Sequence, residues 1–242
     1  QQQINCMVNK LYMQKITTAL SQNKIYFIGL FIVLFAAIIF LALNGKEAAF
    51  ISLNSYHPFY LNVFFINYTF MGDGIFAACL VAVMLFYFKQ KKCALALFGS
   101  FLISGVAAQF IKNMISSPRP KLYFEAGTYL NFIDGVTLTG NSGFPSGHTA
   151  TAFAIATVLA IMIKNKKWQL LILPAAALVG YSRIYLAQHF LLDVIAGAIL
   201  GSFSGVLAYY FASSRISFRS LFKKMYPVSA EPESSPAVIQ TA

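Results

Sequence analysis

The sequence predicts an all-α integral membrane protein whose core is a bundle of six transmembrane helices. Hydrophobic residues make up 58% of the chain and charged residues only 10%, whereas a soluble domain carries about a quarter charged residues. Several apolar runs approach the roughly 20 residues that a helix needs to cross a bilayer. The runs lack the alternation of apolar and polar residues that is typical of a membrane barrel. These observations favour membrane helices over a soluble domain or a barrel.

The apolar runs follow one another in a single domain, residues 25–212. The first run follows a polar segment, residues 1–24, without a cleavage site, which indicates an uncleaved anchor. An aromatic stretch at 57–71, expected at the membrane interface, precedes the second. Two prolines follow the third, and the fourth is rather short. The expected spans are residues 25–43, 72–88, 93–111, 148–163, 168–186 and 190–212.

Lysine and arginine predict how the chain crosses the membrane. Six spans divide the 18 cations into 13 on one side and 5 on the other, and the richer side is cytoplasmic. Both termini are therefore expected in the cytoplasm, with the tail at 213–242 basic at first and then disordered. In a Gram-negative bacterium the membrane would be the inner one and the other side the periplasm. The five outward cations are Lys46, Lys112, Arg119, Lys121 and Arg183.

The net charge of +11 could point to nucleic acid or to an anionic membrane surface. In a chain this apolar the membrane interpretation is favoured, because no basic patch interleaved with aromatic residues is present. We therefore expect membrane lipids as partners and no nucleic acid.

The candidate chemistry lies in three short segments on the outward side. The third segment contains Arg183, His189 and Asp193. His189 and Asp193 are four residues apart and share a helix face, so the carboxylate could orient the imidazole as a nucleophile. On one continuous helix Arg183 and His189 would point apart. We therefore expect a break between the last two spans near residues 187–188.

The other two segments supply groups that bind anions. Ser146 is a good N-cap, Gly147 allows close approach of a ligand, and the first turn of the following helix favours an anion. His148 is placed beside that turn, where it could protonate a leaving oxygen. Lys112 and Arg119 in the first segment add a point charge and a planar fork. Together the segments match what phosphoryl transfer requires.

At these positions the chain resembles the type 2 phosphatidic acid phosphatase superfamily. The signatures K-x6-RP, PSGH and SR-x5-H-x3-D are filled without departure within residues 72–210. The resemblance implies a helical core and metal-independent hydrolysis of a lipid phosphate through a phosphohistidine. It implies that His189 is the nucleophile, Asp193 its orienter and His148 the general acid. The residues that it implies for phosphate binding are Lys112, Arg119, Ser146, Gly147 and Arg183.

The resemblance leaves the lipid open. Residues 118–124 and 141–152 look like bacterial members that act on lipid A or undecaprenyl pyrophosphate, and phosphatidylglycerol phosphate and phosphatidic acid are alternatives. Vanadium haloperoxidases share the anion pocket, but those are soluble. A lipid transporter would not need two histidines and an oriented aspartate. No cluster has the spacing of metal ligands, and no cofactor is expected.

Other residues are expected to have structural roles. The three cysteines contain no C-x-x-C pair and are interpreted as free thiols. Asp73 marks the outer end of the second span, and His57 is given no function. The four-residue repeat of Gly197, Gly201 and Gly205 predicts close helix packing within the monomer.

Overall fold

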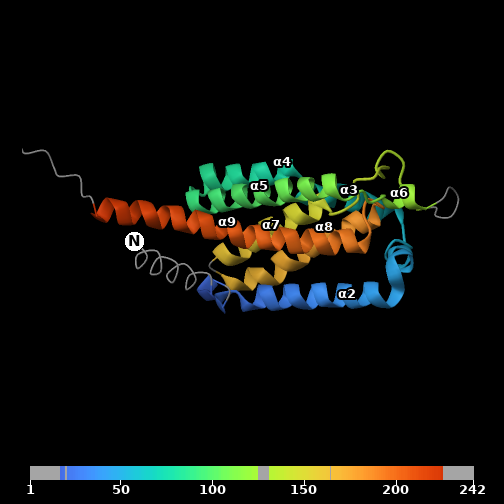
Figure 1. Ribbon diagram of the computed structural model, residues 1–242, viewed down its shortest axis with the longest axis horizontal. Helices are drawn as coiled ribbons and strands as arrows, with labels where there is room; N and C mark the ends of the chain where they lie inside the picture. Colours follow the sequence, from blue (N-terminus) through green and yellow to red (C-terminus); the bar gives the residue numbers. More distant parts are fainter. Residues whose placement is uncertain (1–16, 20, 125–130, 164, 226–242) are drawn as a thin grey trace, which may run out of the picture.

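The computed structural model of the protein describes residues 17–19, 21–124, 131–163 and 165–225, with the backbone alone from 214 onward. The expected N-terminal segment falls largely outside these ranges, as do Cys6 and the tail beyond 225. The described residues form helices and connecting segments (Figure 1), and they contain no strand beyond one isolated bridge between Ser117 and Ser142. The all-α prediction is confirmed.

Three helices are long and apolar enough to cross a bilayer. They are α2 (Lys24–Leu53), α5 (Lys91–Met114) and α9 (Leu191–Met225), of which Leu191–Ser213 is the apolar part. Each extends beyond the apolar run that predicted it. Near its outer end α2 is interrupted at Gly45, whose φ of 75° suits glycine.

The second span is bent. The aromatic stretch forms α3 (Phe59–Tyr68) and the short η1 (Thr69–Gly72), which meet α4 (Gly74–Ala82) and the π-helical η2 (Val83–Tyr87) at 59°. The break falls at Asp73, whose carboxylate caps α4 by accepting the N–H of Ile75 at 2.8 Å. Asp73 is therefore the N-cap of α4, and its place at the outer end of a span stays a prediction.

The remaining elements are shorter. They are α6 (Pro120–Tyr123), α7 (Gly147–Met162), η3 (Lys166–Trp168) and α8 (Gln169–Tyr185), with Pro174 inside the last. By length and composition the described residues thus hold three candidate spans, or four with the bent pair as one. α7 is apolar but has only 16 residues. Six spans therefore stay a prediction.

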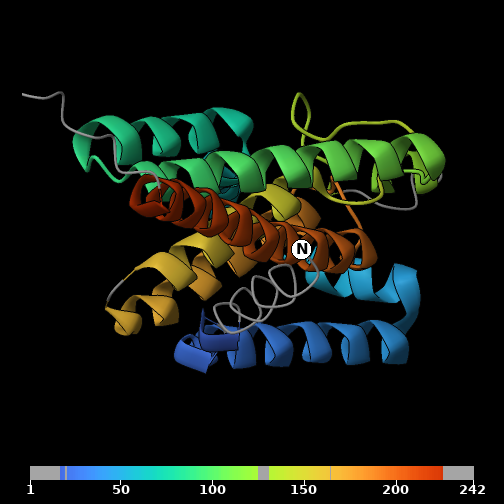
Figure 2. The same ribbon diagram turned by 60° about the vertical axis from the view of Figure 1, so that its left-hand side comes forward.

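α7 lies at the centre of the bundle, against α5, α8 and α9, whereas α2 packs outside on α8 and α9 (Figures 1 and 2). A Cβ added at Gly197, Gly201 or Gly205 would come within 3 Å of a backbone carbonyl oxygen of α7 or of its N-cap, Ser146. The predicted packing of the glycine repeat within the monomer is confirmed. Its consequence is that α9 is held directly against the start of α7, where the candidate site lies.

Candidate active site

The site is built around the break between α8 and α9. α8 ends at Tyr185 and α9 begins at Leu191, and Ala187 between them has a positive φ of 51°. The N–H groups of Gln188 and His189 both donate to the carbonyl oxygen of Arg183, at 2.9 and 3.2 Å. The chain therefore folds back on itself and brings His189 beside Arg183. The predicted break near residues 187–188 is confirmed.

His189 is buried, and one of its ring nitrogens is held firmly. Nδ1 lies 2.6 Å from the carbonyl oxygen of Gly143. A carbonyl can only accept, so Nδ1 carries the proton and the lone pair belongs to Nε2. This is the tautomer that a nucleophilic histidine needs.

The predicted contact between Asp193 and His189 is looser than expected. Asp193 Oδ2 lies 3.6 Å from Nδ1, beyond hydrogen-bonding distance, and instead accepts the N–H of Phe190 at 2.8 Å. The acid thus sits in the first turn of α9 and reaches back to satisfy an N–H at the helix start, as in a capping box. The carbonyl of Gly143 is therefore the direct hydrogen-bond partner of Nδ1, and the role of Asp193 as orienter stays a prediction.

Gly143 was missed by the sequence reasoning. Its N–H donates to the carbonyl of Ser117 at 2.8 Å, and Arg119 N–H donates to the carbonyl of Gly140 at 3.0 Å. A Cβ at Gly143 would lie 2.9 Å from the Ser117 oxygen. Backbone hydrogen bonds therefore join the first and second sequence segments. Only a glycine fits at position 143, between the Ser117 carbonyl and His189, without a shift of the backbone.

The second segment begins α7 as predicted. Ser146 is fully buried, and its side chain accepts the N–H of Thr149 at 3.4 Å and the Thr149 hydroxyl at 2.8 Å. Its own N–H donates to the carbonyl of Asp193 at 3.0 Å, which ties the starts of α7 and α9 together. Gly147 faces Lys112, whose Nζ would be 4.0 Å from an added Cβ. His148 follows, close enough to His189 to interact electrostatically.

The three predicted cations gather around His189. Arg183 and Arg119 are both buried, and Arg119 Nη1 donates to Gln188 Oε1 at 2.8 Å. Burial and then the charges of Arg183, Arg119 and Lys112 hold the pKa of His189 well below its usual value near 6.5. Burial also lowers the pKa of Arg119. Burial and the cations therefore keep His189 neutral, and the cations form an electropositive site.

A fourth segment, absent from the predicted signatures, completes the site. Arg183 Nη1 donates to the hydroxyl of Thr69 in η1 at 2.6 Å, while Nε of Arg183 is buried without a hydrogen-bond partner. Asp73 Oδ2 lies 3.8 Å from Nε2 of His148. The junction of η1 and α4 thus contacts two of the predicted site residues. The only signal in the sequence was an acid between two glycines at the outer end of a span.

Two further residues, Lys46 and His57, have their own contacts. Lys46 lies over the rings of Tyr123 and Phe190, at 4.3 and 4.1 Å from the ring centroids. His57 bonds Asn54 and Asn62 at 3.1 and 3.2 Å. His57 stays outside the cluster of predicted site residues, whereas the charge of Lys46 acts on Asp193.

Residues 93–217 match the PAP2 superfamily, and they include all the predicted site residues. The chain belongs to this family. The predicted resemblance to type 2 phosphatidic acid phosphatases is therefore confirmed. The PAP2 region starts within α5 and takes in α7, α8 and most of α9, which are the elements that carry the site.

Named relatives of this PAP2 chain act on lipid phosphates. It is 30% identical to a lipid A 4'-phosphatase of Porphyromonas gingivalis over 71% of this chain and 70% of that one. It is 30% identical to an undecaprenyl-diphosphatase of Sulfolobus acidocaldarius over 52% of this chain and 59% of that one. The crystal structure of Aquifex aeolicus LpxE superimposes with a TM-score of 0.60 and 32% identity, covering 67% of this chain and 93% of the other.

Proposed function

We propose that this PAP2-type membrane lipid phosphatase hydrolyses a lipid phosphate or pyrophosphate at the outer face of the membrane, through a phosphohistidine and without a metal. The observation that carries the proposal is the environment of His189. A carbonyl fixes its tautomer, and three cations surround it. A neutral imidazole inside a positive site suits attack on a phosphate ester, whose negative charge the cations neutralise.

The reaction follows from the positions of the two histidines. Nε2 of His189 attacks phosphorus, and the bond from phosphorus to the lipid oxygen breaks while His148 donates its proton to that oxygen. Water then attacks the phosphohistidine, His148 takes the proton of the water, and inorganic phosphate leaves. Ser146, Gly147, Lys112, Arg119 and Arg183 bind the phosphoryl oxygens in both steps.

The relatives support lipid A or undecaprenyl diphosphate as the substrate class, because their names give these lipids. Phosphatidylglycerol phosphate and phosphatidic acid belong in the same assay. The periplasmic site and cytoplasmic termini rest on the distribution of lysine and arginine.

The test is the loss of chemistry in His189→Ala. The variant should release no phosphate from any of these lipids, whereas His57→Ala, a histidine outside the site, should stay active. Rapid quenching of the wild type with labelled lipid should leave an acid-labile, alkali-stable label on the protein. Turnover by His189→Ala, or activity lost in chelator and restored by magnesium, would contradict the mechanism.

A further inference from the structure

Two apolar grooves of similar size flank α8, so volume does not distinguish them. One, of about 260 Å³, lies between α4, α7 and α8. The other, of about 310 Å³, lies between α2, α8 and α9. Every side chain that lines either groove is apolar or, in one case, a tyrosine. We propose that the groove between α4, α7 and α8, called here the α4 groove, holds an alkyl chain of the lipid phosphate during turnover.

The face of α7 that lines the α4 groove is the face that carries His148. Ala152, Ile155 and Leu159 line the groove, and they follow His148 by 4, 7 and 11 residues. At 3.6 residues per turn these positions stay within about 40° of one direction. The groove therefore begins one helical turn below His148.

The same relation holds on α8. Val179, Ala176 and Ile172 line the groove and precede Arg183 by 4, 7 and 11 residues. The groove-lining residues of α8 therefore lie on the same helix face as Arg183, whose guanidinium is expected to bind the phosphoryl group. Gly72 of η1 lies at the outer end of the groove, because an added Cβ would be 2.7 Å from the carbonyl oxygen of His148 and 2.8 Å from Cγ1 of Val179. A lipid whose phosphate lies between His148 and Arg183 would therefore place its first methylenes beside η1 and the rest of the chain in the groove.

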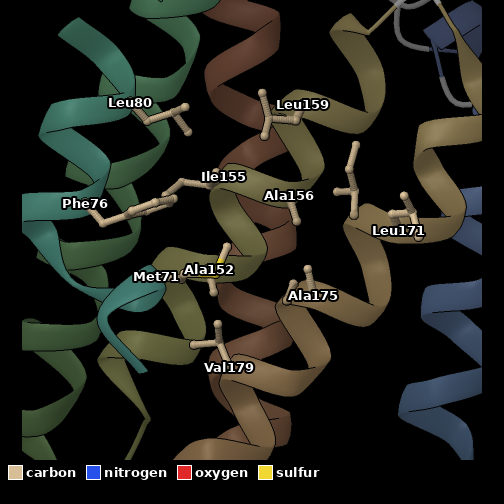
Figure 3. A pocket seen from close by; sticks show the side chains of 12 residues that line it. Met71, Phe76, Leu80, Ala152, Ile155, Ala156, Leu159, Leu171, Ala175 and Val179 are labelled. Atoms are coloured by element: carbon tan, nitrogen blue, oxygen red, sulfur yellow. The ribbon is translucent and has the colours of Figure 1, made fainter. Parts of the chain in front are cut away.

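The third wall comes from η1 and α4. Met71 lies two residues before Asp73, and Phe76 and Leu80 follow Asp73 by 3 and 7 residues. Figure 3 shows Phe76 pointing across the groove toward Ile155. All three walls therefore carry a residue of the polar site at their outer end.

The second groove lacks this continuity. Its α8 residues Ala177, Tyr181 and Ile184 lie about 100° or more from the direction of Arg183. On α9, Val194 and Ala198 are similarly turned away from Asp193. Only the α4 groove therefore shares helix faces with His148 and Arg183.

The depth of the α4 groove also fits a chain. From His148 to Leu159 a helix rises about 16 Å, which is about half of a hydrocarbon core of roughly 30 Å. Leu171, at the far end, is exposed at the surface. Beyond η1 the chain can therefore reach the bilayer without leaving apolar surroundings.

Two matched variants on α8 test this inference, which rests on the proposed function. Ala175→Phe fills the α4 groove, and Ala177→Phe fills the other; both alanines are partly buried. The substrates are phosphatidic acid and phosphatidylglycerol phosphate with octanoyl or palmitoyl chains, in detergent micelles. The measured quantity is the ratio of kcat/KM for the long chain to that for the short chain.

Ala175→Phe should lower this ratio about 15-fold, the effect of two methylenes that are no longer buried. Ala177→Phe should keep the wild-type ratio. A lower ratio in Ala177→Phe alone, or equal ratios in all three proteins, would overturn the groove assignment. In either case phosphate release by the wild type would still support the proposed function. A wild type that releases phosphate from no lipid would overturn the proposed function itself.

A separate observation concerns the charge on His148. Nε2 of His148 lies 3.8 Å from Asp73 Oδ2, and the other charged or titratable groups that act on it are Arg183, His189 and Lys112. Asp73 is therefore the only anion in this set. We propose that Asp73 is a positioning residue that raises the protonated fraction of His148, the proton donor to the leaving oxygen, against burial and the surrounding cations.

The backbone holds this pair in place. A Cβ added at Gly72 would lie 2.7 Å from the carbonyl oxygen of His148 and 2.9 Å from its Cβ, so the segment before Asp73 packs directly on the start of α7. Asp73 is also fixed from the other side, because its Oδ1 caps Ile75. The carboxylate is thus held beside His148 by two independent contacts.

Asp73→Asn isolates the charge, because asparagine caps a helix about as well as aspartate. The alkaline limb of kcat with a lipid phosphate should move down by about one pH unit, since a partly exposed opposite charge near 4 Å supports the protonated form by that amount. p-Nitrophenyl phosphate, whose leaving group needs no proton, should lose little rate. Asp134→Asn, an exposed acid, is the control.

An unmoved alkaline limb, or an equal loss of rate on both substrates at every pH, would show that Asp73 only caps α4. Both results leave the proposed function intact, since His189→Ala tests that function separately.

Discussion

Replacing Gly197 by alanine is expected to lower kcat by about 10- to 100-fold, because the new methyl group pushes α9 away from the start of α7. An added Cβ would lie 2.6 Å from the carbonyl oxygen of Ser146, whereas ordinary contact begins near 3.4 Å. The helices must therefore separate by about 0.8 Å. The bond from Ser146 N–H to the carbonyl of Asp193, 3.0 Å long, spans this interface. A misplacement near 1 Å can cost about a hundredfold in rate.

The stability of the variant separates crowding from a general effect of alanine. In an open helix, glycine to alanine stabilises by about 1 kcal/mol, and overpacking costs about 1–3 kcal/mol. Gly197→Ala should thus melt at the same temperature as the wild type or a few degrees below it. Gly105→Ala in α5, where nothing lies within 4 Å of the added Cβ, should melt about 2–4 °C higher.

The assay is phosphate release from a lipid phosphate in detergent, with the melting temperature of each protein measured in the same detergent. Gly105→Ala should keep wild-type kcat. If Gly197→Ala also kept kcat within twofold of the wild type, this would refute the claim that direct contact between α7 and α9 positions Ser146 and Gly147 for phosphate.

Three further predictions concern the site itself. Asp193→Asn should lower kcat by far less than the roughly 10⁴-fold loss that is typical when an acid alone fixes the tautomer, because the carbonyl of Gly143 holds Nδ1 of His189. A roughly 10⁴-fold loss in a kinetic assay would show that Asp193, and not Gly143, orients His189. Arg119→Lys should lower kcat/KM about tenfold, because a lysine ammonium cannot donate to Gln188 and also make two parallel hydrogen bonds to a phosphate. Unchanged kcat/KM would contradict this reasoning. Since burial and the cations lower the pKa of His189, His189 stays neutral in mildly acidic solution, and its acid limb in kcat/KM against pH should lie below 6.5. A limb at or above that value would be inconsistent with the buried imidazole.

Helix starts, the break in the chain and the fold class were largely predictable from the sequence. The N-cap at Ser146 follows from residue type and from the apolar run behind it, and the break before His189 follows from helical geometry alone. The all-α class follows from the length of the apolar runs. These inferences need only neighbours within a few residues.

Contacts between distant segments were not predictable in the same way. Thr69 and Arg183 are 114 residues apart, and Gly143 reaches His189 across 46 residues through a backbone carbonyl. A carbonyl is present at every position and leaves no signature in the residue type. Asp193 was assigned the role of Gly143 because its side chain had the right spacing, but the start of α9 required its carboxylate for an N–H.

The partners of the two arginines explain how the site can be held rigid and still favour an anion. Arg119 donates to the side-chain oxygen of Gln188, and Arg183 donates to the hydroxyl of Thr69. Both acceptors are neutral, so each bond fixes the direction of a guanidinium without cancelling its charge. A carboxylate in either place would have held the arginine as firmly, but it would have competed with phosphate for the same positive charge. The two arginines, which the distribution of lysine and arginine predicts to face outward, are thus positioned by oxygen atoms that leave their charge available for a phosphate group.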